Sequence, residues 1–233
     1  MSEAQGTAAA ILLGYFEDFL RALANALGVA EKLSKLVPDK RNKRLFEDVL
    51  EPIHEKLLEV HTQYLAIFNW FSNQLPMAIG DKEWLHSTTR ELLNKDQVAI
   101  EIGALKRDFE KRAGEFNGLR TSLRAHAESY IRHFDPGSPE RGFIWATIEY
   151  FLRRDFANQT EERLIAMADM IADEGSHSLL STPVSGVLNR ISEEEDPTVI
   201  GQIVDLEKIE LAKRFSDVSR CFYHAKRELL RLK

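Results

Sequence analysis

The sequence predicts an all-α protein, folded as an elongated antiparallel bundle of about six to eight helices, three of them long with heptad-like seams. Apolar residues recur alternately four and three residues apart over long stretches, which is the spacing of one helix face. No segment shows the period of two that a half-buried strand requires. Of the 233 residues, 44% are hydrophobic and 29% are charged, a balance typical of an ordered globular chain.

The long apolar stripes are coiled-coil-like and predict that these helices lie along other helices. The first consists of Phe46, Leu50, Ile53, Leu57, Val60, Tyr64, Ile67 and Phe71. The second consists of Val98, Ile102, Leu105, Phe109, Phe116, Leu119 and Leu123. The third consists of Leu211, Phe215, Val218, Phe222, Ala225, Leu229 and Leu232.

Proline and glycine divide the N-terminal part of the chain into helices. A first amphipathic helix is expected over about 7–36, where Pro38 ends it, followed by a basic linker over 39–44. A second helix should continue to about residue 74 and stop at Pro76. Pro52 lies inside it, but the apolar stripe keeps its phase across this proline, so one kinked helix is favoured over two. A short helix over 81–94 and a long one over 96–133 should follow.

The strongest break lies at 135–139, where two prolines and a glycine cluster. It divides the chain into an N-terminal long-helix part (1–134) and a C-terminal helical part (135–233), unless the two form one continuous domain. Ser138 and Pro139 are the expected N-cap and first-turn proline of an enclosed helix that continues to about residue 156. A capping box predicts a helix over about 158–175, and a final helix should start at Asp196 and Pro197 and could run to Lys233.

Charge and cysteine content constrain the possible partners and the compartment. The formal net charge of -6 argues against nucleic-acid binding and against an anionic membrane surface, since both require a basic protein surface. The single cysteine, Cys221, cannot form an intrachain disulfide, which suits a reducing cytoplasm. No uncharged apolar stretch approaches the ~20 residues that span a bilayer.

The final helix carries the most suggestive charge pattern, with an acidic start and a basic end. On an antiparallel two-fold mate, each acidic half would face a basic half. The residues expected at this interface are Phe215, Val218, Phe222 and Leu229 on the apolar seam, with Arg220, Lys226 and Arg227 as charged partners. The competing interpretation is intramolecular: the pattern complements the helix dipole, and the basic end could lie on the acidic second helix.

Two Glu-x-x-His spacings, Glu51 to His54 and Glu83 to His86, are similar to the paired motifs of ferritin-like di-iron proteins. Residues at i and i+3 share a helix face, so each pair could ligate a metal. A di-iron site also needs a glutamate from each of two further helices, and no helix lies between the two motifs to supply one. The competing interpretation is two histidines on solvated helix faces, and no cofactor is expected.

Arg120 and His126 resemble in their spacing the arginine and histidine of HEPN-type helical ribonucleases. The resemblance implies that arginine stabilises the charge of a phosphate while histidine moves a proton. The length of the helices is also similar to that of BAR-type dimers, which bind lipid surfaces, although this is an analogy of shape.

The sequence favours a non-enzymatic helical interaction or scaffold protein that self-associates through its long helices in the cytoplasm. Its expected partners are proteins, including a second copy of itself, whereas nucleic acid and membrane are not expected. The HEPN-like ribonuclease and the lipid-binding BAR-like dimer are the alternatives.

Overall fold

A computed structural model describes residues 2–79, 118, 121–122, 125–130, 135, 137–151, 190, 194 and 196–231. These residues form helices and turns without a strand, which confirms the predicted all-α class for this part of the chain. The elements are α1 (Ser2–Leu33), α2 (Pro38–Leu45), the π-helical turn η1 (Phe46–Leu50), α3 (Glu51–Ile79), α7 (Pro139–Phe151) and α10 (Pro197–Leu230).

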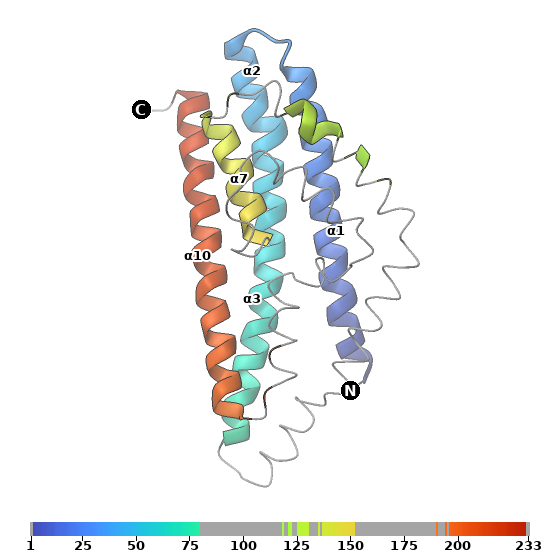
Figure 1. Cartoon of the computed structure of the whole chain (residues 1–233), viewed down its shortest axis with the longest axis vertical. Helices are drawn as coiled ribbons and strands as arrows, with labels where there is room; N and C mark the ends of the chain where they lie inside the picture. The colour runs from blue at the N-terminus through green and yellow to red at the C-terminus, as the bar shows by residue number, and fades with distance from the viewer. Residues whose placement is uncertain are drawn as a thin grey trace.

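The three long helices of the described part, α1, α3 and α10, lie side by side along the length of the molecule (Figure 1). The chain ascends through α1, descends through α2, η1 and α3, and ascends again through α10, so neighbouring long helices run antiparallel. The short helix α7 descends beside α10 and packs against it. The result is that α3 contacts both α1, which precedes it closely in the sequence, and α10, which lies far from it.

The second helix is continuous across Pro52, as the phase of its apolar stripe predicted, because the turn η1 ends one residue before Glu51, which leads into the proline. A proline ring collides with the carbonyl one turn earlier and cannot donate a backbone hydrogen bond. In η1 the N–H of Glu51 bonds to the carbonyl of Phe46, one residue further back than in an α-helix. The chain thereby enters the proline turn with a wider backbone, and the helix continues to Ile79.

Two predicted boundaries of this helix were wrong. The basic segment 39–44 is not a linker but helix α2, with Pro38 in its first turn and Val37 extended before it. Proline has no N–H to lose at that position and its fixed φ suits a helix start. At the other end, Pro76 does not stop α3, which includes it.

Of the two helix starts in the C-terminal part, α10 is capped by a side chain as predicted, whereas the buried Oγ of Ser138 has no hydrogen-bond partner among the described residues and does not cap α7. The Asp196 side chain accepts a hydrogen bond from the N–H of Thr198 at 2.8 Å and caps α10. Before α7, the Asp135 side chain accepts from the N–H of Gly137 at 2.9 Å, and the Ser138 carbonyl accepts the first helical bond, from Gly142, at 3.1 Å. The α10 helix ends where Arg231 adopts a left-handed conformation with φ of 52°.

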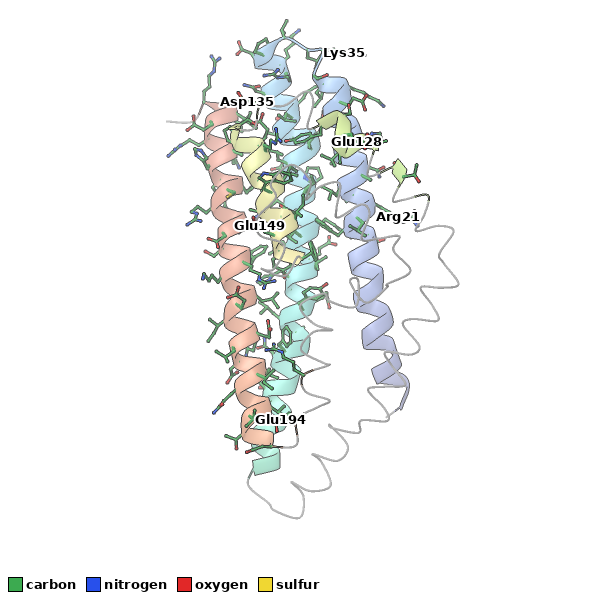
Figure 2. The ribbon with its side chains drawn as sticks, viewed as in Figure 1. Arg21, Lys35, Glu128, Asp135, Glu149 and Glu194 are labelled. Atoms are coloured by element: carbon green, nitrogen blue, oxygen red, sulfur yellow. The ribbon has the colours of Figure 1, made fainter. Side chains whose placement is uncertain are left out.

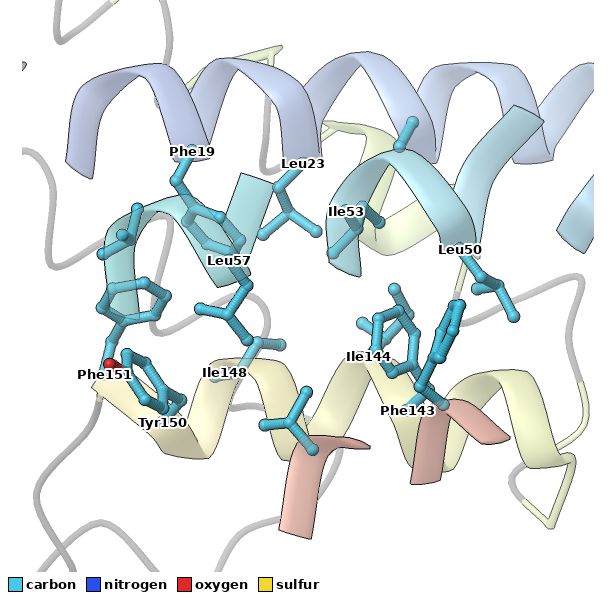
Figure 3. Close-up of a cluster of buried hydrophobic side chains, with 14 of the residues drawn as sticks. Phe19, Leu23, Leu50, Ile53, Leu57, Phe143, Ile144, Ile148, Tyr150 and Phe151 are labelled. Carbon is cyan, nitrogen blue, oxygen red and sulfur yellow. The ribbon is translucent and has the colours of Figure 1, made fainter. Parts of the chain in front are cut away.

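One hydrophobic cluster joins α1, η1, α3, α7 and α10 (Figure 3). Every member of the first apolar stripe whose side chain is described is buried; these are Phe46, Leu50, Ile53, Leu57, Val60 and Tyr64. The cluster includes residues from both sides of the predicted boundary at 134/135. The division into 1–134 and 135–233 stays a prediction about folding units.

The helices predicted over 81–94 and 158–175, and most of that over 96–133, lie outside the described residues. The described part contains five α-helices and one π turn. The count of about six to eight helices therefore stays a prediction for the whole chain.

Phe222 should be among the most costly side chains to truncate. It is 5% exposed, and its ring centroid lies 5.4 Å from that of Phe46 and 5.5 Å from that of Phe143. We expect Phe222→Ala to lower the free energy of unfolding by about 3–5 kcal/mol in urea denaturation. The exposed control Arg227→Ala should change it by less than about 0.5 kcal/mol, and equal effects would contradict this placement.

Candidate functional site

Two histidines of α3 stack on two phenylalanines of α10, one heptad apart on each helix. The rings of His54 and Phe222 have centroids 4.0 Å apart and an interplanar angle of 9°. Those of His61 and Phe215 are 4.1 Å apart at 5°. Because the helices are antiparallel, the earlier histidine meets the later phenylalanine. The stacks fix the register between α3 and α10.

His61 is the more enclosed of the two histidines, at 7% exposure. Its Nδ1 lies 3.0 Å from the hydroxyl of Tyr150 on α7, with which it forms a hydrogen bond. Burial lowers the pKa of His61 to about 4, and burial also raises the pKa of Tyr150 well above its ordinary value. His61 is therefore a neutral imidazole at physiological pH.

A chain of polar contacts continues from Tyr150 to α10. The Arg214 guanidinium donates to the carbonyl oxygen of Tyr150 at 3.4 Å. Its Nε donates to the Glu210 carboxylate at 3.3 Å. Since each of these groups has a partner in this chain of contacts, His61 and Tyr150 have a structural role here: they join α3, α7 and α10.

The predicted metal pair Glu51 and His54 does not form part of a metal cluster in the described region. His54 stacks on Phe222, its Nε2 is buried, and no described residue offers that atom a hydrogen-bond partner. Burial lowers the pKa of His54, and the nearby Glu55 carboxylate partly opposes this effect. No group of three or more potential ligands gathers among the described residues, while Glu83 and His86 lie outside them.

The predicted ribonuclease histidine, His126, packs against α1. Its Nδ1 lies 3.6 Å from the Glu31 carboxylate. The ring also covers Gly28, where an added Cβ would lie 3.0 Å from Cε1 and 3.1 Å from Nε2 of the histidine. Gly28 thus permits the close approach of His126 to α1. Arg120 lies outside the described residues, so its position relative to His126 stays a prediction.

The seam residues predicted for self-association are packed within one chain. Val218, Phe222 and Leu229 are buried, and Phe215 is half-buried against the same core. A surface for a second copy on α10 would therefore use the opposite, outer face of the helix.

The three basic residues predicted as charged partners lie near or at the surface and have local contacts. Arg220 pairs with Asp217 at 2.9 Å. Arg227 pairs with Glu228 at 3.3 Å. The ammonium group of Lys226 lies 5.3 Å from the centroid of the Phe46 ring. Beyond them, Arg231 pairs with Asp39 of α2 at 2.9 Å, so part of the basic end is neutralised within the chain.

The outer face of α10 exposes two large aliphatic side chains, Leu206 at 64% and Ile209 at 66%. Side chains project from α10 on the side away from α3, and Glu194 lies near the start of that helix (Figure 2). The heptad pattern predicts the buried seam and does not include this pair. Leu206 and Ile209 are one turn apart and fall off the seam, which is the signal in the sequence that marks them.

No helix within the described residues is long and apolar enough to cross a membrane. Searches against protein-family models, curated proteins and solved structures found no match to this chain.

The depressed pKa of His61 predicts a loss of stability in acid. The unfolded imidazole binds a proton as the pH falls through 6.5, whereas the folded one does so only near pH 4. The contribution of neutral His61 to the free energy of unfolding is thus complete above pH 6.5 and should decrease by roughly 3 kcal/mol by pH 4. In urea unfolding at a series of pH values, His61→Phe should lack this component, while His224→Gln at an exposed position should retain it. Identical pH profiles for wild type and His61→Phe would refute the assignment.

Gly28 and His126 should be energetically coupled. Alanine is favoured over glycine in a helix interior by about 0.5–1 kcal/mol, but here its Cβ would displace His126. We expect Gly28→Ala to give no gain in the free energy of unfolding in the wild-type chain. In a His126→Ala background the same change should stabilise by about 0.5–1 kcal/mol. A double-mutant cycle measures this, and a Gly28→Ala effect independent of His126 would contradict the contact.

Proposed function

We propose that this protein is a non-enzymatic helical interaction protein that self-associates through the outer face of α10. The observation that carries the proposal is the exposure of Leu206 and Ile209, one turn apart on a helix of 34 residues. Single exposed apolar residues are normal on a protein surface. Two neighbouring aliphatic side chains on a long helix, flanked by charges of both signs, are typical of helix-to-helix contacts.

The expected affinity follows from the amount of apolar surface. Complete burial of one such side chain contributes roughly 1.5–3 kcal/mol, and a two-fold contact would bury part of four of them. Association costs at least about 4 kcal/mol in lost translational and rotational freedom. The surplus is small, so we expect a weak and concentration-dependent dimer, with charged residues selecting its orientation.

The other parts of the proposal rest on the sequence. They are an antiparallel bundle with heptad-like seams that extends beyond the described helices, and action in a cytoplasm with protein partners. The HEPN-like and BAR-like alternatives also rest on sequence resemblance, and no contact of His126 or α10 favours them over an interaction role.

Self-association should depend on the outer face of α10 and not on exposed leucines in general. We expect Ile209→Asp to raise the dissociation constant at least tenfold in sedimentation equilibrium, because it places a charge in the apolar contact. Leu58→Asp, at a 45%-exposed position on α3, is the matched control and should leave the association unchanged. Both variants should retain the helical circular-dichroism spectrum. A chain that stays monomeric at millimolar concentration would refute the proposed function.

A further inference from the structure

The exposed face of α10 is symmetric about Ile209. Leu206 and Ala212 lie three residues before and after Ile209, and Gln202 and Ser216 lie seven residues before and after it. All of these residues are exposed. Their spacing of four, three, three and four residues keeps them on one face of the helix. A two-fold axis at Ile209 would therefore place the stripe of one copy against the same stripe of a second copy, with Leu206 opposite Ala212 and Gln202 opposite Ser216.

The charges along the stripe distinguish an antiparallel mate from a parallel one. Asp205 and Lys213 are both exposed and equally distant from Ile209, on opposite sides of it. In an antiparallel pair each Asp205 would face the Lys213 of the other copy, so the symmetry produces two such pairs. In a parallel pair in register, Asp205 would face Asp205 and Lys213 would face Lys213. Like charges that face each other disfavour that arrangement.

The ends of the stripe are complementary in the same sense. The exposed Arg220 lies as far after Ile209 as Thr198 lies before it, close to the capping carboxylate of Asp196. An antiparallel mate would bring the Arg220 guanidinium to this helix start. The helix dipole alone would repel a positive charge there, but the carboxylates of Asp196 and Glu194 supply the negative charge with which an arginine can pair.

We infer that the outer face of α10 binds a second copy of this chain as an antiparallel pair with its two-fold axis at Ile209. Ile209 contacts Ile209 of the mate, Leu206 packs on Ala212, and Asp205 pairs with Lys213. This inference rests on the proposed self-association and adds its occupant, direction and register.

Cysteine cross-linking tests the register directly. In a Cys221→Ala background, Ile209→Cys should cross-link to itself with a short bis-maleimide at a protein concentration where the dimer forms. Gln202→Cys and Ser216→Cys should each fail alone, because in this register each residue lies about 20 Å from its own copy along the helix axis. A mixture of those two variants should cross-link. His224→Cys is the exposed control, at about 45 Å from its copy.

A charge exchange supplies a second readout on the same face. Asp205→Lys and Lys213→Asp should each raise the dissociation constant roughly tenfold, since each creates two repulsive contacts across the axis. The double exchange should restore the wild-type value, and high salt should reduce all of these differences.

The outcomes separate the register from the proposed function. Cross-linking of Ile209→Cys together with the mixed pair, and rescue by the double exchange, supports the antiparallel pair. A dimer in sedimentation in which Ile209→Cys does not cross-link overturns the inference and leaves the proposed self-association standing. A strict monomer overturns both.

Discussion

The packing of α10 antiparallel against α3 is the contact on which the other arrangements depend. Its register is set by two parallel ring stacks, His54 on Phe222 and His61 on Phe215. Histidine in these positions differs from a further phenylalanine because its ring carries polar nitrogens. The Nδ1 of His61 forms a hydrogen bond with Tyr150, so the α3 residue that stacks on α10 also orients α7. The segment of α3 from His54 to His61 thus joins three helices that are distant in the sequence.

The two faces of α10 have different roles because they meet different surroundings. The inner face, which includes Val218 and Phe222, is covered by the rest of the chain. The outer face exposes Leu206 and Ile209 beside charged residues. The intramolecular interpretation placed the basic end of α10 on the acidic second helix. In the structure Arg231 pairs with Asp39 of α2, while Arg220 and Arg227 pair with neighbours on α10 itself.

The sequence predicted the features that depend on local periodicity and on capping. The all-α class, the buried members of the first stripe and the capped start of α10 followed from spacing and from Asp196 with Pro197. Boundaries near prolines were predicted less well. Whether a proline begins, interrupts or is tolerated within a helix depends on backbone adjustments nearby, as Pro38, Pro52 and Pro76 demonstrate. The ring stacks and the contact of His126 with Gly28 depend on helix register, which no single segment encodes.

The turn η1 also bears on how this chain tolerates changes in length. A π turn contains one residue more than the α turn that it replaces, and the helices on either side keep packing into the same core. The additional residue is absorbed within 46–50, so the faces of α2 and α3 are not rotated against their neighbours. Removal of one residue within this turn would restore an ordinary α-helix, whereas the same removal in the middle of α3 would rotate every later side chain by about 100°. The segment before Pro52 is therefore a place where the chain can change in length without losing the phase of its core.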